Sequence, residues 1–115
     1  MSSNNESIFP PATPTMSKKR ADLAPDQVEA FRNFSSEVFK EGALDEKTKQ
    51  LIAVASAHIT QCPYCIKGHT KQAKQKGATN EEIMEAIWVA AEMRAGGSYA
   101  HAALAIDEIE KIDGL

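Results

Sequence analysis

The fold is decided by two helical segments around a short break, in a stretch that reads DEKTKQLIAVASAHITQCPYCIKGHTKQAKQKGATNEEI over residues 45–83. Asp45 is a good N-cap for the first helix, whose apolar side chains recur at helical spacing. Pro63 suits the first turn of a second helix because its missing N–H has no partner there, and Cys62 would then be the N-cap. Gly77 ends this second helix. The stretch therefore predicts two consecutive helices with a cysteine at the start of the second.

Before this stretch the sequence predicts a tail and a further helix. Residues 1–21 are rich in Pro, Ser, Asn and Thr, and such a segment buries too little apolar surface to order itself. From Pro25 apolar side chains recur at helical spacing until Gly42, which indicates a helix. We therefore expect a flexible tail over residues 1–21 and a helical domain over residues 22–115.

After this stretch the pattern remains helical. Thr79 and Glu82 form a T-x-x-E capping box for a helix that Gly96 and Gly97 are expected to break. A last helix is predicted over residues 98–111. No segment alternates with a period of two, so we expect an all-α bundle of about five to six helices. Such a small domain with Ala-rich helices buries little apolar surface, which favours an oligomer in which copies of the chain cover one another.

Composition excludes several classes of protein. The chain has 115 residues, a mass of 12.5 kDa and a net charge of −3, which argues against binding of nucleic acid. No apolar run approaches the roughly 20 residues that a membrane span needs. The N-terminus has no apolar segment of the secretory type, so we expect a cytoplasmic protein without a membrane partner. Two cysteines are too few for a disulfide-rich scaffold.

The two cysteines belong to a C-x-x-C-x-x-x-H pattern, which is typical of redox chemistry. Cys62 and Cys65 lie in the first turn of a predicted helix, where unpaired N–H groups and the helix dipole stabilise a thiolate. His69 follows Cys65 by four residues and therefore shares its helix face. The same segment carries four lysines that add positive charge, namely Lys67, Lys71, Lys74 and Lys76.

Other uses of the cysteine pair are less consistent with the sequence. A structural zinc site could take the two thiolates with His58 or His69, but a second cysteine pair is absent. Haem attachment requires histidine directly after the second cysteine, where this chain has Ile66. Thioredoxin-like proteins also use C-P-Y-C, although they place it after a β-strand, whereas here a helix precedes it. The third alternative is a non-enzymatic protein, namely a scaffold, a redox-sensing oligomer or a zinc-stabilised module.

Residues 44–102 resemble the AhpD-like alkylhydroperoxidase group of the carboxymuconolactone decarboxylase-like superfamily. The resemblance rests on C-x-x-C-x-x-x-H after a long amphipathic helix and on the G-A-T-x-x-E-I-x-E-A segment that follows. It implies a trimer or hexamer with no bound cofactor. It also implies that Cys65 is activated through His69 and that Cys62 closes the disulfide, whereas the helix start by itself favours Cys62 as the more acidic thiol.

The function that this resemblance implies is thiol–disulfide exchange. We expect an enzyme that reduces disulfides or alkyl hydroperoxides in antioxidant defence. Electrons would come from a dithiol or a reductase, and a peroxiredoxin is one partner the resemblance suggests. The alternative is a lyase that acts on a lactone, as in the founding branch of the superfamily, although that chemistry does not require a C-x-x-C pair.

One position departs from the pattern of this group. Twelve residues before Cys62 the group has a glutamate that feeds a proton relay, and this chain has Gln50. A glutamine side chain accepts hydrogen bonds but takes up no proton at accessible pH. We therefore expect disulfide exchange to survive better than peroxide reduction, unless another side chain serves the relay. Five residues are candidates for that role, namely Glu46, His58, Glu92, Tyr99 and His101.

Overall fold

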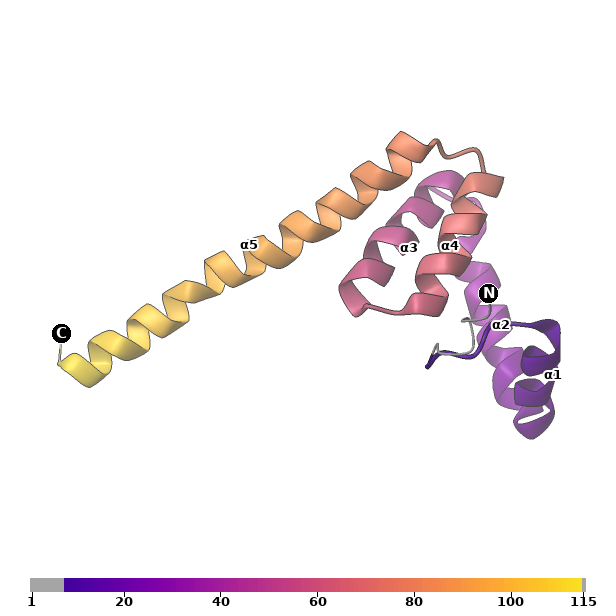
Figure 1. Cartoon of the computed structure of the whole chain (residues 1–115), viewed down its shortest axis with the longest axis horizontal. Helices are drawn as coiled ribbons and strands as arrows, with labels where there is room; N and C mark the ends of the chain where they lie inside the picture. Colours follow the sequence, from indigo (N-terminus) through magenta and orange to yellow (C-terminus); the bar gives the residue numbers. More distant parts are fainter. Residues whose placement is uncertain (1–7, 115) are drawn as a thin grey trace, which may run out of the picture. The chain divides into compact units, whose positions relative to one another are not determined.

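The computed structural model describes residues 8–114 and contains five helices. In chain order they are α1 (Pro14–Leu23), α2 (Pro25–Phe39), α3 (Glu46–Thr60), α4 (Pro63–Gln75) and α5 (Asn80–Asp113) (Figure 1). No strand occurs among residues 8–114, so the expected all-α fold is confirmed. The helices fall into two units, α1 with α2 and α3 with α4 and α5, divided between Lys40 and Glu41.

The first unit contains a helix where the sequence predicts a flexible tail. Thr13 caps α1 with its side chain, and Pro14 occupies the first helical position, so this polar segment has a strong helix start. Arg32 of α2 donates to the hydroxyl of Ser17 of α1 at 3.0 Å. Residues 14–21 of the expected tail over residues 1–21 are therefore helical, with a capped start, and residues 1–7 lie outside the described residues.

In the second unit, α3 and α4 lie side by side (Figure 1). The side chain of Asp45 caps the first turn of α3, as predicted. Gln61 ends this helix in the left-handed conformation with a φ of 59°, and Cys62 then caps α4. An ion pair of 3.1 Å between Glu46 and Lys76 joins the start of α3 to the end of α4. The tight turn at Gln61 thus places the cysteines directly at the start of α4.

A small apolar core holds α5 against the other two helices. Its buried members are Val54, Ala73, Ala78 and Ile83, with Leu51 and Ile87 packed against them. Thr79 and Glu82 form the predicted capping box at the start of α5. The Glu82 carboxylate also pairs with Lys47 at 3.0 Å, so the first turn of α5 is tied to the first turn of α3.

The predicted break at Gly96 and Gly97 is wrong, since α5 runs without interruption from Asn80 to Asp113. A glycine inside a helix is less favourable than alanine by only about 1 kcal/mol. The neighbouring alanines and other good helix formers offset this difference. Gly97 also lines a groove between α5 and α3, where a small residue leaves space between the two helices.

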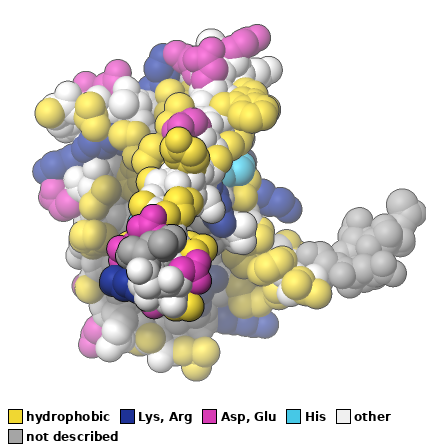
Figure 2. All heavy atoms as spheres, turned by 90° about the vertical axis from the view of Figure 1, so that its left-hand side faces the viewer, with side chains coloured by type: hydrophobic (Ala, Val, Ile, Leu, Met, Phe, Trp, Pro, Cys, Tyr) yellow, Lys and Arg dark blue, Asp and Glu magenta, His cyan; other side chains and the backbone are white. Residues whose placement is uncertain are grey.

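The C-terminal half of α5 exposes many apolar side chains. Every residue from 98 to 114 is exposed, and α5 extends beyond the α3–α4 pair (Figure 1). Figure 2, which faces the C-terminal end of α5, shows hydrophobic side chains at the surface on this side. The large ones on this half are Tyr99, Leu104, Ile106, Ile109 and Ile112. Among the described helices none is both long and apolar enough to cross a lipid bilayer.

Candidate active site

The candidate active site begins at the N-terminus of α4, where the two cysteines occupy one turn. Cys62 is the N-cap, and its sulfur accepts the backbone N–H of Cys65 at 3.3 Å. Both side chains are partly accessible, and both are free thiols. This is the arrangement predicted from the C-P-Y-C sequence, because the N-cap position directs a side chain toward the unpaired N–H groups of the first turn.

The two thiols differ in acidity. The pKa of Cys62 is lowered because the Cys65 thiol donates a hydrogen bond to its sulfur, and the backbone N–H groups of Cys65 and Tyr64 add to this effect. The pKa of Cys65 is raised because its thiol donates to Cys62 and because burial disfavours its charged form. The structure therefore favours Cys62 as the first thiolate, in agreement with the argument from the helix start.

Behind the cysteines, three polar side chains form a chain of hydrogen bonds between α3 and α4. Gln50 of α3 is 3% exposed, and its Oε1 lies 2.8 Å from Nδ1 of His69. Its Nε2 donates to Oε1 of Gln72 at 3.1 Å. With its amide nitrogen directed to Gln72, Gln50 presents only an acceptor oxygen to the histidine.

This network determines the tautomer of His69. Because Oε1 of Gln50 can only accept, Nδ1 of His69 carries the proton and Nε2 is left as an acceptor. Burial lowers the pKa of His69 from its ordinary value of 6.5, so the ring is neutral at pH 7. His69 follows Cys65 by one helical turn, and the two therefore lie on the same face of α4. A neutral imidazole that carries its proton on Nδ1 has an acceptor at Nε2, and such a nitrogen is suited to take a proton from a thiol.

The structure engages two of the other relay candidates elsewhere. The carboxylate of Glu46 pairs with Lys76. Nδ1 of His58 lies 2.8 Å from the carbonyl oxygen of Val54 in its own helix. Neither of these two contacts involves Gln50 or His69.

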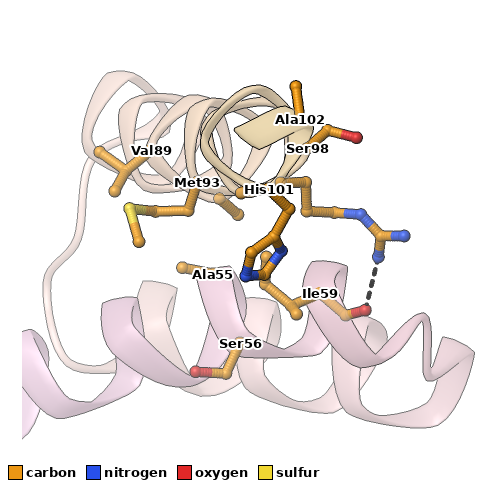
Figure 3. A pocket seen from close by; sticks show the side chains of 11 residues that line it. Ala55, Ser56, Ile59, Val89, Met93, Ser98, His101 and Ala102 are labelled. Atoms are coloured by element: carbon orange, nitrogen blue, oxygen red, sulfur yellow. Dashed lines mark hydrogen bonds between the residues drawn. The ribbon is translucent and has the colours of Figure 1, made fainter. Parts of the chain in front are cut away.

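The remaining three candidates lie on α5, and all are exposed. Glu92 lies next to Gly96 on the surface of the helix, and Tyr99 is 86% exposed. His101 points from α5 toward α3 (Figure 3). It helps to line an open groove of about 830 Å³ between these helices.

Apolar side chains make up most of this groove. Arg94 also lines the groove and donates to the carbonyl oxygen of Ile59 at 2.7 Å, a bond marked by the dashed line in Figure 3. The apolar lining includes Ala55, Val89 and Met93. The groove is thus separate in its lining from the cysteines, and His101 belongs to it.

The fold agrees with a comparison of the sequence with known protein families. The sequence profile of the carboxymuconolactone decarboxylase family matches residues 25–108. The chain belongs to the carboxymuconolactone decarboxylase family.

Relatives in this family extend over most of the chain. Uncharacterized protein 4 in the cox locus of Paracoccus denitrificans is 65% identical over 86 residues, which cover 75% of this chain and 78% of that protein. The crystal structure of a carboxymuconolactone decarboxylase family protein from Legionella pneumophila, in its apo form, has a TM-score of 0.67 at 37% identity. It covers 84% of this chain and 87% of its own. The shared fold is therefore supported by sequence and structure together.

One of the more distant relatives has a name that states an activity. Alkyl hydroperoxide reductase AhpD of Corynebacterium kroppenstedtii is 26% identical over 74 residues. The match covers 64% of this chain and 42% of that protein. The resemblance to AhpD is thus confirmed as distant homology.

Gln72 is a residue of the candidate site of this carboxymuconolactone decarboxylase family protein that could not be predicted from the sequence. It follows His69 by three residues and therefore shares its helix face, which is the one available signal. The partner that gives it a role, Gln50, is 22 residues away in sequence and comes into contact only when α3 packs on α4. Among the residues that the structure describes, no group of three or more His, Cys, Asp or Glu side chains could hold a metal ion.

Proposed function

We propose that the protein is a thiol–disulfide oxidoreductase in which Cys62 is the attacking thiol and Cys65 the resolving thiol. The observation that carries the proposal is the position of the Cys62 sulfur, which caps α4 and accepts the Cys65 N–H. A sulfur held at a helix start by a hydrogen bond to its anionic form is activated as a nucleophile at neutral pH. This order differs from the one that the family resemblance implies, in which Cys65 is the activated thiol.

The first step is attack on the substrate. The Cys62 thiolate forms a bond to one sulfur of the substrate disulfide, and the other sulfur leaves as a thiolate. The product is a mixed disulfide between Cys62 and half of the substrate. The Cys65 N–H and thiol lose their anionic acceptor in this step, because the sulfur of Cys62 becomes neutral.

The second step resolves the mixed disulfide. Cys65 gives its proton to Nε2 of His69 and attacks the sulfur of Cys62, and the second substrate thiolate leaves and takes up this proton from His69. The substrate has then gained two electrons, and the cysteine pair has lost two by forming a disulfide. Gln50 supports this step because its acceptor oxygen holds the His69 proton on Nδ1. An external dithiol or a reductase returns the pair to its reduced form.

Hydroperoxides are a second substrate class for the same thiols. The Cys62 thiolate would take the terminal oxygen of the peroxide to give a sulfenic acid and an alcohol, and Cys65 would then close the disulfide with release of water. The distant AhpD relative supports this use. Because Gln50 cannot pass on a proton, we expect peroxide reduction to be slower than disulfide exchange.

Trapping the mixed disulfide tests the proposal. We expect Cys62→Ser and Cys65→Ser each to abolish turnover of a small disulfide with a dithiol donor, since each removes one half of the redox pair. Cys65→Ser should in addition accumulate the mixed disulfide on Cys62, seen by mass spectrometry as the mass of half the substrate. Cys62→Ser, the matched control with one thiol left, should trap far less, because the remaining thiol has the higher pKa.

Full turnover by either variant would refute a two-cysteine mechanism. Trapping mainly on Cys65 would reverse the order of the two cysteines. Turnover of a carboxymuconolactone by a variant lacking both cysteines would favour the lyase reaction for which the family is named.

A further inference from the structure

The segment that carries the thiols is strongly positive in an otherwise acidic chain. Residues 47–80 contain six lysines and no aspartate or glutamate. All sixteen acidic residues therefore lie outside this segment, together with only seven of the thirteen lysines and arginines. The segment comprises nearly all of α3, the turn with Cys62, and all of α4. The segment around the candidate active site is thus the part of the chain in which positive charge is not balanced by acidic residues.

Some of these lysines are neutralised within the fold, and others are not. Lys47 pairs with Glu82 and Lys76 pairs with Glu46. Lys74 donates to the neutral amide oxygen of Asn80 at 2.7 Å and keeps its charge uncompensated there. Lys67 and Lys71 are exposed, and no ion pair joins either of them to a residue within the described range 8–114. The uncompensated charge is thus on α4, the helix whose first turn holds the cysteines.

These lysines share one face of α4. Lys67, Lys71 and Lys74 are spaced by four and three residues, so they form a row on the solvent-exposed side of the helix, which we name the lysine row. Tyr64, 43% exposed, precedes Lys67 by three residues and extends the row to the turn that contains Cys62. A partner that lies along the lysine row therefore ends at the turn that contains Cys62.

We infer that the lysine row docks an acidic protein segment that flanks the disulfide to be reduced. The inference rests on the proposed function and names the class of its substrate: a protein disulfide with aspartate or glutamate residues beside it. Opposite charges on the two surfaces raise the rate of encounter by about 10-fold to 1000-fold at low ionic strength and fix the register of approach. A polynucleotide is the less favoured anion, because the acidic remainder of the chain would repel its extended backbone.

Three disulfide substrates test this inference. Two are cystine-linked peptide dimers that differ only in having glutamates or lysines beside the cysteine, and the third is the uncharged bis(2-hydroxyethyl) disulfide. We expect the wild-type protein to reduce the acidic dimer about tenfold faster than the basic dimer at low salt. This preference should shrink as salt is added, because ions screen the charges over about 10 Å at 0.1 M.

Charge reversal of the lysine row provides the decisive comparison. Lys67→Glu combined with Lys71→Glu should lower the ratio of the reduction rate of the acidic dimer to that of the basic dimer by about tenfold or more. The ratio of the two rates reports docking, because a change in thiol chemistry alters both rates equally. The rate with the uncharged disulfide reports the thiol chemistry by itself. The matched control is Lys19→Glu combined with Arg20→Glu on α1, which changes the net charge equally and should keep the wild-type ratio.

The possible failures are distinguishable. Turnover of all three disulfides with the same acidic-to-basic ratio in wild type and row variant would overturn the docking inference and leave the proposed function intact. An equal loss of ratio in the α1 control would attribute the effect to net charge and also overturn it. Binding of a short DNA duplex without any preference among the disulfides would assign the lysine row to nucleic acid instead. Absence of turnover with every disulfide would refute the proposed function and the inference with it.

Discussion

Gln50 and His69 define how the site handles protons. The His69 ring is partly buried beside a neutral amide, and this burial lowers its pKa. Gln50→Glu would put a carboxylate at the same position, where it favours the charged imidazolium. We expect this substitution to raise the pKa of His69, measured from its ring proton signals in an NMR titration. The control is Gln75→Glu, which adds the same charge at an exposed position of α4; an equal shift in both variants would contradict the role of the contact.

The contact between Gln50 and His69 also affects how the stability of the protein changes as the pH falls. The folded pKa of His69 lies below 6.5, so the unfolded chain takes up this proton first as the pH falls. The contribution of His69 to the free energy of unfolding is thus intact above pH 6.5 and decreases below it. In Gln50→Glu the sign should reverse, and acidification to pH 5.5 should then cost less stability than in the wild type. Urea unfolding at pH 8 and pH 5.5 measures the difference, and an identical loss in both proteins would exclude a part for His69.

At the scale of elements, α5 is held as one helix across two adjacent glycines. A Cβ at Gly96 would lie 3.5 Å from a carboxylate oxygen of Glu92, which is ordinary contact with a flexible side chain. Gly96→Ala should therefore stabilise the protein by about 0.5–1 kcal/mol in urea unfolding, because alanine loses less backbone entropy than glycine. The reverse substitution at the exposed neighbour, Ala95→Gly, should destabilise it by a similar amount. Loss of stability in Gly96→Ala would mean that this position needs its small size for packing.

The helices also show how far sequence reasoning extends. The start of α4 at Cys62 and the capping box at Thr79 could be predicted, because caps are local hydrogen bonds between residues about three apart. The helix α1 and the continuity of α5 were not predicted. The effect of a proline or a glycine on a helix depends on the residues around it, so neither residue type by itself shows where a helix begins or ends. The contact of Gln50 with Gln72 could not be predicted either, since it depends on how α3 packs on α4. Local signals were sufficient for the cysteine turn but not for the network behind it.

At the scale of the whole molecule, the exposed half of α5 predicts self-association. Its sixteen residues from 98 to 113 have no buried member, and an unsupported helix of this length is marginal in water. Leu104 and Ile109 are 68% and 54% exposed, and burying such side chains contributes about 1.5–3 kcal/mol each. We therefore propose that copies of the chain cover this half of α5, as the expected trimer or hexamer would allow. Light scattering should give a mass of several times 12.5 kDa.

Added charge on α5 tests whether this surface is the interface. Leu104→Glu combined with Ile109→Glu should shift the scattering mass toward that of one chain, because a carboxylate buried between copies has no compensating partner. The helical signal of the second half of α5 should weaken at the same time, since the surface that stabilises it is lost. Gln27→Glu combined with Asn33→Glu adds two charges at exposed positions of α2 and should keep the wild-type mass. A wild-type mass of 12.5 kDa would show that the chain does not self-associate and that α5 is stable on its own. An assembly that both double variants leave intact would show that the exposed half of α5 is not the interface.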